Sequence, residues 1–240
     1  ISPRVKIVSG GNLSPAVMFY NNASGQEGLL ARYDVLVLDE VQKIKFDRPE
    51  EIIGSLKGYL ANNRITRGGK VTIPSDCGLV LLANIKVDEL QQPFSDLLVE
   101  ELQDYWHETA FLDRFNGIIP GWEISKFEEK MIAKGIGFKA DFFSDTLTAM
   151  RYDGRFDDFA RRHLEFSDEV KIRDQNAIIA NTAGFLKILF PDCNVTKEEF
   201  DSFCLLPARR MRQLIRDQLW ILDPEFRQTS KLLEVKSVNF

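Results

Sequence analysis

The chain has 240 residues, of which 44% are hydrophobic and 28% charged, an ordinary globular composition with enough length to bury a substantial core. This excludes disordered, collagen-like and coiled-coil proteins, and no apolar run reaches the roughly 18 residues that a membrane-spanning helix needs. The net charge of −5 argues against a generally basic nucleic-acid-binding surface but does not exclude a local basic segment.

Short aliphatic runs alternate with segments of helical spacing over the first 126 residues. The runs lie at residues 5–8, 35–38, 79–83 and 118–119, and residues 49–62 and 94–109 have helical spacing. The runs at 35–38 and 79–83 are apolar without alternation, which is typical of strands buried on both faces of a parallel sheet. The first 126 residues are therefore predicted to form an α/β domain.

Helical spacing dominates from about residue 127, and strand-like runs disappear there. Helices are predicted at residues 141–150, 175–190, 197–205 and 208–219. Residues 127–222 are therefore predicted to form a smaller all-α domain, and residues 223–240 to begin a linker. Because the chain starts without methionine and stops within an extended pattern, both ends are expected to continue in a longer protein.

The three cysteines, Cys77, Cys193 and Cys204, form no CxxC pair, and the two histidines neighbour neither each other nor a cysteine in the sequence. This spacing predicts neither a disulfide framework nor a zinc site. Such cysteine usage is typical of a reducing compartment, so we expect a cytoplasmic protein.

Two acidic residues, Asp39 and Glu40, directly follow the run at 35–38. At the carboxyl end of a buried strand, one such carboxylate holds the water shell of Mg²⁺ and the other polarises an attacking water. Asn84 follows the next run and is expected beside Glu40. A solvated turn after the first strand and a capping role for Asn84 are the alternative interpretations.

Arg114 lies on a short segment before residues 116–121, where an arginine is able to reach a neighbouring subunit's nucleotide. The alternative is a salt bridge with Asp113 or with the acidic stretch before it, since residues 87–113 contain eight acids and no Lys or Arg. The residues alone leave both interpretations open.

The ordered set of these elements resembles the AAA+ ATPases. By this resemblance Asp39 and Glu40 match the Walker B acids. Asn84 matches sensor 1, and Arg114 matches the arginine finger. The resemblance implies ATP and Mg²⁺ as cofactors, with Asp39 holding the metal through water, and a lid formed by the helical domain.

A further match lies on the last predicted helix. Its Met211-Arg212-Gln213-Leu214-Ile215-Arg216 segment resembles the sensor 2 helix of Lon-type proteases. The resemblance makes Arg212 the expected nucleotide contact from the lid, with Arg209 and Arg210 as rivals.

The resemblance narrows to the Lon-like proteins of BREX phage-defence systems and covers nearly the whole chain. It rests on the segments Ser9-Gly10-Gly11-Asn12-Leu13, Phe19-Tyr20-Asn21, Leu56-Lys57-Gly58-Tyr59-Leu60, Ile119-Pro120-Gly121-Trp122 and Ile172-Arg173-Asp174. It implies a homo-hexamer or larger ring that acts on DNA, with a protein substrate as the second possibility and no membrane partner. It also implies a divergent Lon-like domain after these residues.

The phosphate-binding GxxxxGK[ST] loop of such ATPases is absent from the sequence. Gly69-Lys70 is no such loop, because position 64 is Arg rather than Gly and position 71 is Val rather than Ser or Thr. We therefore expect these residues alone neither to bind nor to hydrolyse ATP appreciably. By resemblance, the loop and its strand precede Ile1, so we expect a gap, a rearrangement or a substituting segment beside the strand that leads to Asn84.

A β-hairpin is predicted within residues 59–83, with strands at 64–67 and 70–73 and a turn at Gly68-Gly69. Residues 57–75 contain four basic residues and no acid. The BREX Lon-like proteins have relatives that are similar to minichromosome-maintenance helicases. In those helicases such a hairpin enters the channel of the ring, where by resemblance Arg64, Arg67 and Lys70 would contact DNA phosphates. A solvated basic turn, or a hairpin packed on acidic residues, is the alternative. A second channel loop is expected at residues 21–28.

The favoured hypothesis is the AAA+ core of a Lon-like ATPase that couples ATP hydrolysis to action on DNA in phage defence. The first alternative is the core of an ATP-dependent Lon-type protease or unfoldase. Phe19-Tyr20 at the base of the second loop supports this alternative, although the loop tip lacks the aromatic pair of protein-threading loops. The second alternative is a non-enzymatic assembly module.

Overall fold

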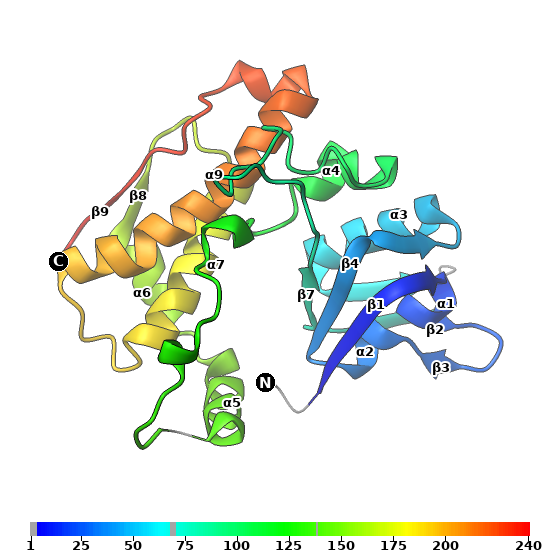
Figure 1. The fold of residues 1–240 in the computed structure, drawn as a ribbon, viewed down its shortest axis with the longest axis horizontal. Coiled ribbons are helices and arrows are strands. Elements are labelled where there is room, and N and C mark those ends of the chain that lie inside the picture. The colour runs from blue at the N-terminus through cyan, green and yellow to red at the C-terminus, as the bar shows by residue number, and fades with distance from the viewer. Residues whose placement is uncertain (1–3, 68–70, 138) are drawn as a thin grey trace. The chain divides into compact units, whose positions relative to one another are not determined.

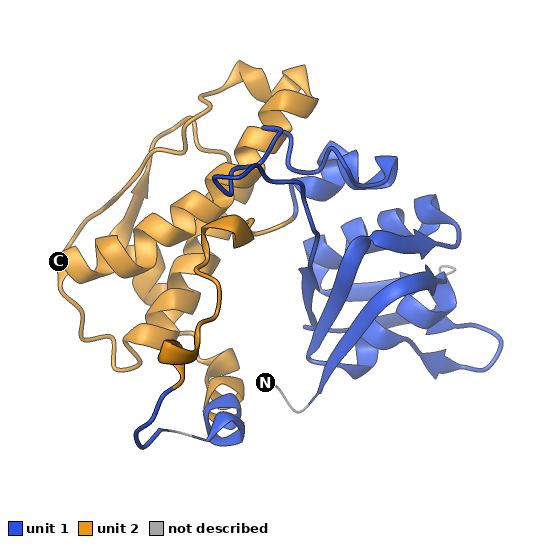
Figure 2. Cartoon of the chain, viewed as in Figure 1, with its two compact units in different colours: residues 1–114, 133–145 blue, residues 115–132, 146–240 orange. Residues whose placement is uncertain are grey.

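The computed structural model describes residues 4–67, 71–137 and 139–240. The chain divides into two compact units (Figure 2). Unit 1 comprises residues 1–114 and 133–145, and unit 2 comprises residues 115–132 and 146–240. The predicted boundaries of core, lid and linker, near residues 127 and 223, stay predictions.

A three-stranded parallel sheet forms the centre of unit 1 (Figure 1). Its strands, in spatial order, are β1 (Val5–Leu13), β4 (Val35–Phe46) and β7 (Gly78–Leu81). Leu36 and Leu38 of β4 are fully buried, whereas Val35 and Val37, which alternate with them on the other face, are only half-buried. The predicted α/β fold with a parallel sheet is confirmed, and β4 is its central strand.

β7 is an edge of this sheet among the described residues, because it pairs there only with β4. Val80 and Leu82 are 40% and 47% exposed. The prediction that this run is buried on both faces is therefore wrong for the described chain. The place beyond β7, where we expect a gap or a substituting segment, holds no strand of the described residues.

Short helices and two hairpins complete unit 1. The helices are α1 (Pro15–Met18), α2 (Leu29–Arg32), α3 (Pro49–Asn62), the 3-10 helix η1 (Asp104–His107) and α4 (Thr109–Leu112). The hairpins pair β2 (Tyr20–Asn21) with β3 (Gln26–Glu27), and β5 (Arg64–Arg67) with β6 (Val71–Pro74). The helix predicted at 49–62 and the hairpin predicted after it are confirmed. The predicted turn at Gly68-Gly69 and the candidate residue Lys70 lie outside the described residues.

Residues 94–109, predicted to be helical, form turns followed by the short η1, so that prediction is wrong. Short polar side chains take backbone N–H groups that a helix would use internally. Ser95 Oγ accepts the N–H of Leu97 at 3.1 Å.

Unit 2 is mainly helical. Its helices are α6 (Arg155–His163), α7 (Ile172–Leu189), α8 (Lys197–Glu199), the π-helix η5 (Phe200–Leu205) and α9 (Leu206–Leu222). The 3-10 helices are η2 (Gly121–Glu123), η3 (Glu129–Met131), η4 (Met150–Tyr152) and η6 (Pro224–Gln228), while α5 (Ala140–Ala149) begins in unit 1 and ends in unit 2. The helices predicted at 141–150, 175–190, 197–205 and 208–219 are confirmed. The sequence did not predict α6, because only its Phe156 and Ala160 are buried.

Two strands also belong to unit 2, so the prediction of an all-α lid is wrong. β8 (Leu164–Phe166) pairs antiparallel with β9 (Val235–Ser237). β8 has only three residues, too few for an alternating pattern to stand out in the sequence, whereas β9 lies in the extended pattern at the end of the sequence. Leu233, just before β9, is buried in the core of unit 2.

Ile118 and Ile119 form no strand, contrary to prediction. The N–H of Ile118 donates instead to the Met211 carbonyl of α9 at 3.0 Å. This bond uses the backbone group that a sheet ladder would need.

Two phenylalanines of η5 are expected to contribute very differently to the free energy of unfolding. Phe200 is fully buried, whereas Phe203 is 55% exposed. Phe200→Ala is expected to lower the free energy of unfolding by about 3–5 kcal/mol, because it removes a whole buried ring and leaves a cavity. Phe203→Ala, the matched control, is expected to lower it by less than about 1 kcal/mol. Urea unfolding measures both, and equal losses would contradict the assigned packing.

Candidate functional site

The carboxyl half of β4 contains a bulge directly after Asp39. β1 and β4 pair in register up to Ser9 and Asp39, and pairing resumes between Gly11 and Ile44. Glu40 has a φ of 52°, in the left-handed region that residues with a Cβ rarely adopt. Bulges re-aim side chains and occur beside active sites. The predicted Asp39-Glu40 pair therefore lies at a strained place on the central strand.

Both oxygens of the Glu40 carboxylate have partners within the sheet. Lys43 Nζ donates to Oε1 at 2.5 Å, and Ser9 Oγ donates to Oε2 at 3.4 Å. The Lys43 hydrogen bond holds the pKa of Glu40 below its ordinary value, with partial opposition from burial. Glu40 is therefore held as a carboxylate, the form in which it is able to polarise water.

The chain that follows β7 runs beside this bulge. Val41 N–H donates to the Leu82 carbonyl at 3.0 Å, and Asn84 N–H donates to Gln42 Oε1 at 3.4 Å. The Asn84 side chain is exposed. The structure thus brings the backbone of Asn84 to the bulge that follows Asp39 and Glu40, as the sequence predicts for neighbouring parallel strands.

Arg114 lies at the end of α4, and its guanidinium folds back on that helix. Its Nη1 donates to the Ala110 carbonyl, and its Nε is buried without a hydrogen-bond partner among the described residues. Neither contact involves a carboxylate, so the alternative of a salt bridge with Asp113 is not supported. Among the described residues, no hydrogen bond or ion pair joins Arg114 to the bulge of β4.

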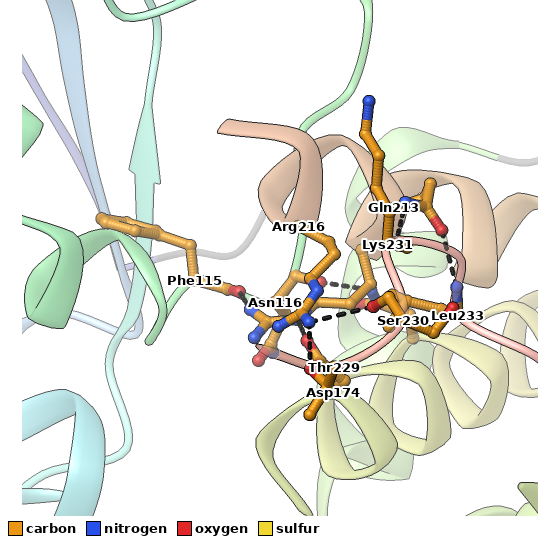
Figure 3. A network of polar contacts seen from close by, with 11 residues as sticks. Phe115, Asn116, Asp174, Gln213, Arg216, Thr229, Ser230, Lys231 and Leu233 are labelled. Carbon is orange, nitrogen blue, oxygen red and sulfur yellow. Dashed lines mark hydrogen bonds and ion pairs between the residues drawn. The ribbon is translucent and has the colours of Figure 1, made fainter. Parts of the chain in front are cut away.

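Arg212 of α9 is buried within unit 2 beside Asp174, which Figure 3 labels. Its Nε donates to Asp174 Oδ1 and its Nη1 to the Phe115 carbonyl, each at 2.6 Å. The side chains of Arg212 and Asp174 are 1% and 4% exposed. The predicted contact between Arg212 and nucleotide therefore conflicts with its burial in this conformation.

The two rival arginines on α9 are more accessible. Arg210 is exposed and pairs with Glu123. Arg209 is half-buried and lines a cavity of about 340 Å³ together with Lys197 and Lys236. Arg209 and Arg210, unlike Arg212, are thus at least partly accessible to solvent.

The two predicted channel loops are joined by Arg67. Its Nη1 donates to the Tyr20 carbonyl of hairpin β2–β3, and its Nη2 lies 3.5 Å from Glu51 of α3. Its side chain is only 12% exposed. Arg67 thus anchors the hairpin, whereas Arg64 is exposed at the edge of a 690 Å³ groove. Of these two predicted phosphate contacts, only Arg64 is displayed to solvent.

The described residues contain no group of three or more His, Cys, Asp or Glu side chains placed to hold a metal ion. Mg²⁺ needs no such group, because it binds through one or two carboxylates and keeps water and phosphate ligands. Asp39, half-buried at the bulge, fits that role. No helix of the described chain is long and apolar enough to cross a membrane.

Residues 1–232 match the family described as "Lon-like protease BrxL-like, ATPase domain". The chain belongs to this family. It is 31% identical over 226 residues to the Lon-like protease BrxL of Escherichia coli O9:H4 (strain HS), a match that covers 91% of this chain and 31% of that protein. It is 28% identical over 227 residues to the Lon-like protease BrxL of Bacillus cereus (strain H3081.97), covering 90% and 32%. The chain thus spans about a third of the length of these BrxL proteins.

A shorter match extends to a viral protein. The chain is 28% identical over 136 residues to the uncharacterized protein ORF426 of Acidianus filamentous virus 1 (isolate United States/Yellowstone). This match covers 49% of the chain and 32% of ORF426. The resemblance to Lon-like proteins inferred from the motifs is confirmed by the two BrxL relatives and the family.

Lys43, Ser9 and Asp174 were not predicted to be site residues, although Ser9 and Asp174 lie in segments that carry the family resemblance. The Glu40–Lys43 spacing was visible, but in a straight strand residues three apart point to opposite faces. Only the bulge brings them together. Asp174 was quoted as part of a family motif, while its pairing with Arg212 depends on the packing of α7 against α9.

The Lys43 contact makes a prediction about the Glu40 carboxyl. Lys43→Met is expected to raise the pKa of Glu40 towards its ordinary value, because the first cause of the lowering is removed. Carboxyl ¹³C chemical shifts followed through a pH titration measure this. Lys45→Met, which replaces an exposed lysine of the same strand, is the control and is expected to leave the titration unchanged. Because the folded pKa is lowered, the contact stabilises the fold above the ordinary pKa and is lost as pH falls through the lowered value.

Proposed function

We propose that the chain is the AAA+ core of a ring-forming Lon-like ATPase that couples ATP hydrolysis to action on DNA in phage defence. The observation that carries this proposal is the bulged end of β4, with Asp39 and Glu40 beside the chain that leads to Asn84. In a chain of the BrxL-like ATPase family, this arrangement supports nucleotide hydrolysis.

Each side chain has a role that its chemistry supports. Asp39 would hold Mg²⁺ through water, and Glu40, kept ionised by Lys43, would take a proton from the attacking water. Asn84 would orient that water with its amide. Bound Mg²⁺ would neutralise charge on the phosphates. Arg114, whose buried Nε lacks a described partner, would donate to the nucleotide of a neighbouring subunit.

Hairpin β5–β6 supports DNA as the substrate. Arg64 is exposed on β5, in a segment with four basic residues and no acid. A cation displayed on such a hairpin is suited to phosphate contacts along a strand. Arg67 holds this hairpin to the base of the second loop, so that the two loops would act together.

Phe19 supplies the observation against the first alternative, an ATP-dependent protease or unfoldase. Protein threading by Lon-type machines usually relies on an exposed aromatic-hydrophobic pair, but Phe19 is only 1% exposed. Tyr20 is half-buried in the hairpin. The second alternative is a non-enzymatic assembly module. The bulge that places Asp39 and Glu40 beside the backbone of Asn84 disfavours it, because an assembly module needs no such arrangement.

Glu40 is the residue whose replacement tests ATP hydrolysis in the full-length protein. Glu40→Gln is expected to reduce ATP turnover about 100-fold or more while nucleotide binding is retained, because the amide cannot take a proton from water. Glu89→Gln, at an exposed loop position, is the control and is expected to keep normal turnover. Normal ATP turnover in Glu40→Gln would contradict the proposed role of Glu40.

Arg64 tests the role of the hairpin in DNA binding by the full-length protein. Arg64→Ala is expected to weaken affinity for all DNA sequences and to reduce the slope of log affinity against log salt by about 1, because one phosphate contact is lost. Lys45→Ala, which removes an exposed cation from β4, should keep the slope. An unchanged slope in Arg64→Ala contradicts the contact. Fluorescence anisotropy over a salt series provides the measurement.

A further inference from the structure

The chain that leads from β7 to Asn84 is bonded to β4 on both sides of the bulge. The register of β4 with β7 ends at Leu38. Leu82 then makes two further backbone bonds: its N–H donates to the Leu38 carbonyl at 2.9 Å, and its carbonyl accepts the Val41 N–H at 3.0 Å. The backbone is therefore fixed to β4 up to a point two residues before Asn84.

The position of Asn84 itself depends on a side chain of β4. Residues 82–86 form neither helix nor strand, so no ladder continues to Asn84. Its N–H donates to Gln42 Oε1 at 3.4 Å. Its own side chain is exposed and has no hydrogen-bond partner among the described residues, so the amide is available to a water molecule. Gln42 thus holds the backbone of Asn84 while the side chain of Asn84 stays open.

Gln42 is in turn fixed by a second glutamine. Gln103 Nε2 donates to the Gln42 carbonyl at 2.7 Å, and Gln103 Oε1 accepts the indole N–H of Trp106 at 3.0 Å. Trp106 is buried, and its ring centroid lies 5.4 Å from that of Phe46 on β4. Both ends of the Gln103 amide are therefore committed, and they hold the backbone of Gln42 against an aromatic cluster of unit 1.

Loss of the Gln42 acceptor would leave Asn84 tethered at Leu82. Two residues of extended chain span up to about 7 Å, which allows the Asn84 amide a wide range of positions. A shift of about 1 Å in a group that positions a reactant is able to lower a rate about 100-fold. The contact with Gln42 is therefore expected to matter for catalysis more than for the stability of the fold.

We propose that Gln42 is a positioning residue for Asn84. Its Oε1 holds the Asn84 N–H, so that the side-chain amide of Asn84 meets the attacking water beside Glu40. This inference rests on the proposed function, in which Asn84 orients that water. Gln42 acts through Asn84, and the contacts that support it all lie within unit 1.

Substitutions at Gln42 test this role in the full-length protein, because they leave in place the backbone carbonyl that Gln103 uses. Gln42→Leu removes the acceptor at similar size, and Gln42→Asn withdraws it by one methylene. Gln42→Glu keeps an acceptor oxygen at the same distance along the side chain and is the rescue variant. Gln92→Leu, at an exposed loop position, is the control.

The expected result is a split between turnover and binding. Gln42→Leu and Gln42→Asn are expected to lower kcat for ATP about 10-fold, with nucleotide affinity changed less than about 2-fold, since a misplaced water costs transition-state stabilisation. Gln42→Glu is expected to stay within about 3-fold of the unmodified protein at saturating ATP and Mg²⁺. Gln92→Leu is expected to match the unmodified protein. Circular dichroism verifies folding, and Gln42→Asn carries the comparison if Gln42→Leu does not fold.

A double substitution separates positioning from an independent role of Gln42. Asn84→Ala keeps the backbone N–H but removes the amide that orients water, so Gln42 then has nothing left to position. Adding Gln42→Leu to Asn84→Ala is therefore expected to change kcat less than about 2-fold beyond Asn84→Ala alone. A purely structural role would instead lower kcat by the same factor in both backgrounds.

The contrary outcomes are distinguishable. If Asn84→Ala keeps normal turnover, the proposed role of Asn84 fails and the inference falls with it. If Asn84→Ala is slow but Gln42→Leu and Gln42→Asn turn over normally, only the inference is overturned. Equal effects of Gln42→Leu in both backgrounds, or failure of Gln42→Glu to restore kcat, likewise overturn the inference alone.

Discussion

The buried ion pair between Arg212 and Asp174 is the interaction on which the geometry of unit 2 depends. Both side chains are almost wholly removed from water, so loss of either would leave an uncompensated charge at a cost of about 3–5 kcal/mol. The pair joins α9 to α7. The same guanidinium also donates to the Phe115 carbonyl. One side chain therefore joins α9 to α7 and holds the segment that begins at Phe115.

One turn further along α9, Arg216 is also buried, but its guanidinium is compensated by backbone carbonyls rather than by a carboxylate. Its Nη2 donates to the Phe226 and Ser230 carbonyls at 3.0 and 2.9 Å, while the Phe226 ring lies 5.5 Å from the guanidinium carbon. Backbone dipoles and a ring face thus replace a counter-ion. Its Nε and Nη1 have no described hydrogen-bond partner, so this balance is incomplete. With Arg212 and Arg216, α9 holds both the segment that precedes unit 2's helices and the segment that follows them.

Local sequence signals predicted the elements whose causes are local. Pro49 at the start of α3 and the acidic pair after a run of aliphatic residues both mark features that the structure contains. The bulge at Glu40 escaped prediction, because it depends on how β1 and β4 resume pairing rather than on either strand alone. The contacts of Glu40 with Lys43 and Ser9 could not be predicted from the sequence for the same reason. The roles of Asp39, Asn84 and Arg114 were assigned by resemblance, and these roles stay predictions.

The backbone hydrogen bonds that hold residues 115–118 to α7 and α9 were not predicted, because carbonyl and N–H groups occur throughout the chain. Only Gly117, whose place against Met211 leaves no room for a Cβ, marks this contact in the sequence. The burial of Arg212 could, in contrast, have been inferred from the sequence. Arg212 shares a stripe with Ala208, Ile215 and Leu219, all buried, at spacings that keep residues on one helix face. The resemblance suggested a nucleotide contact for Arg212, whereas the structure places its side chain in the core of unit 2. The charge of Arg212 is already paired with Asp174, and its second donor is taken by the Phe115 carbonyl, so its guanidinium is committed within unit 2.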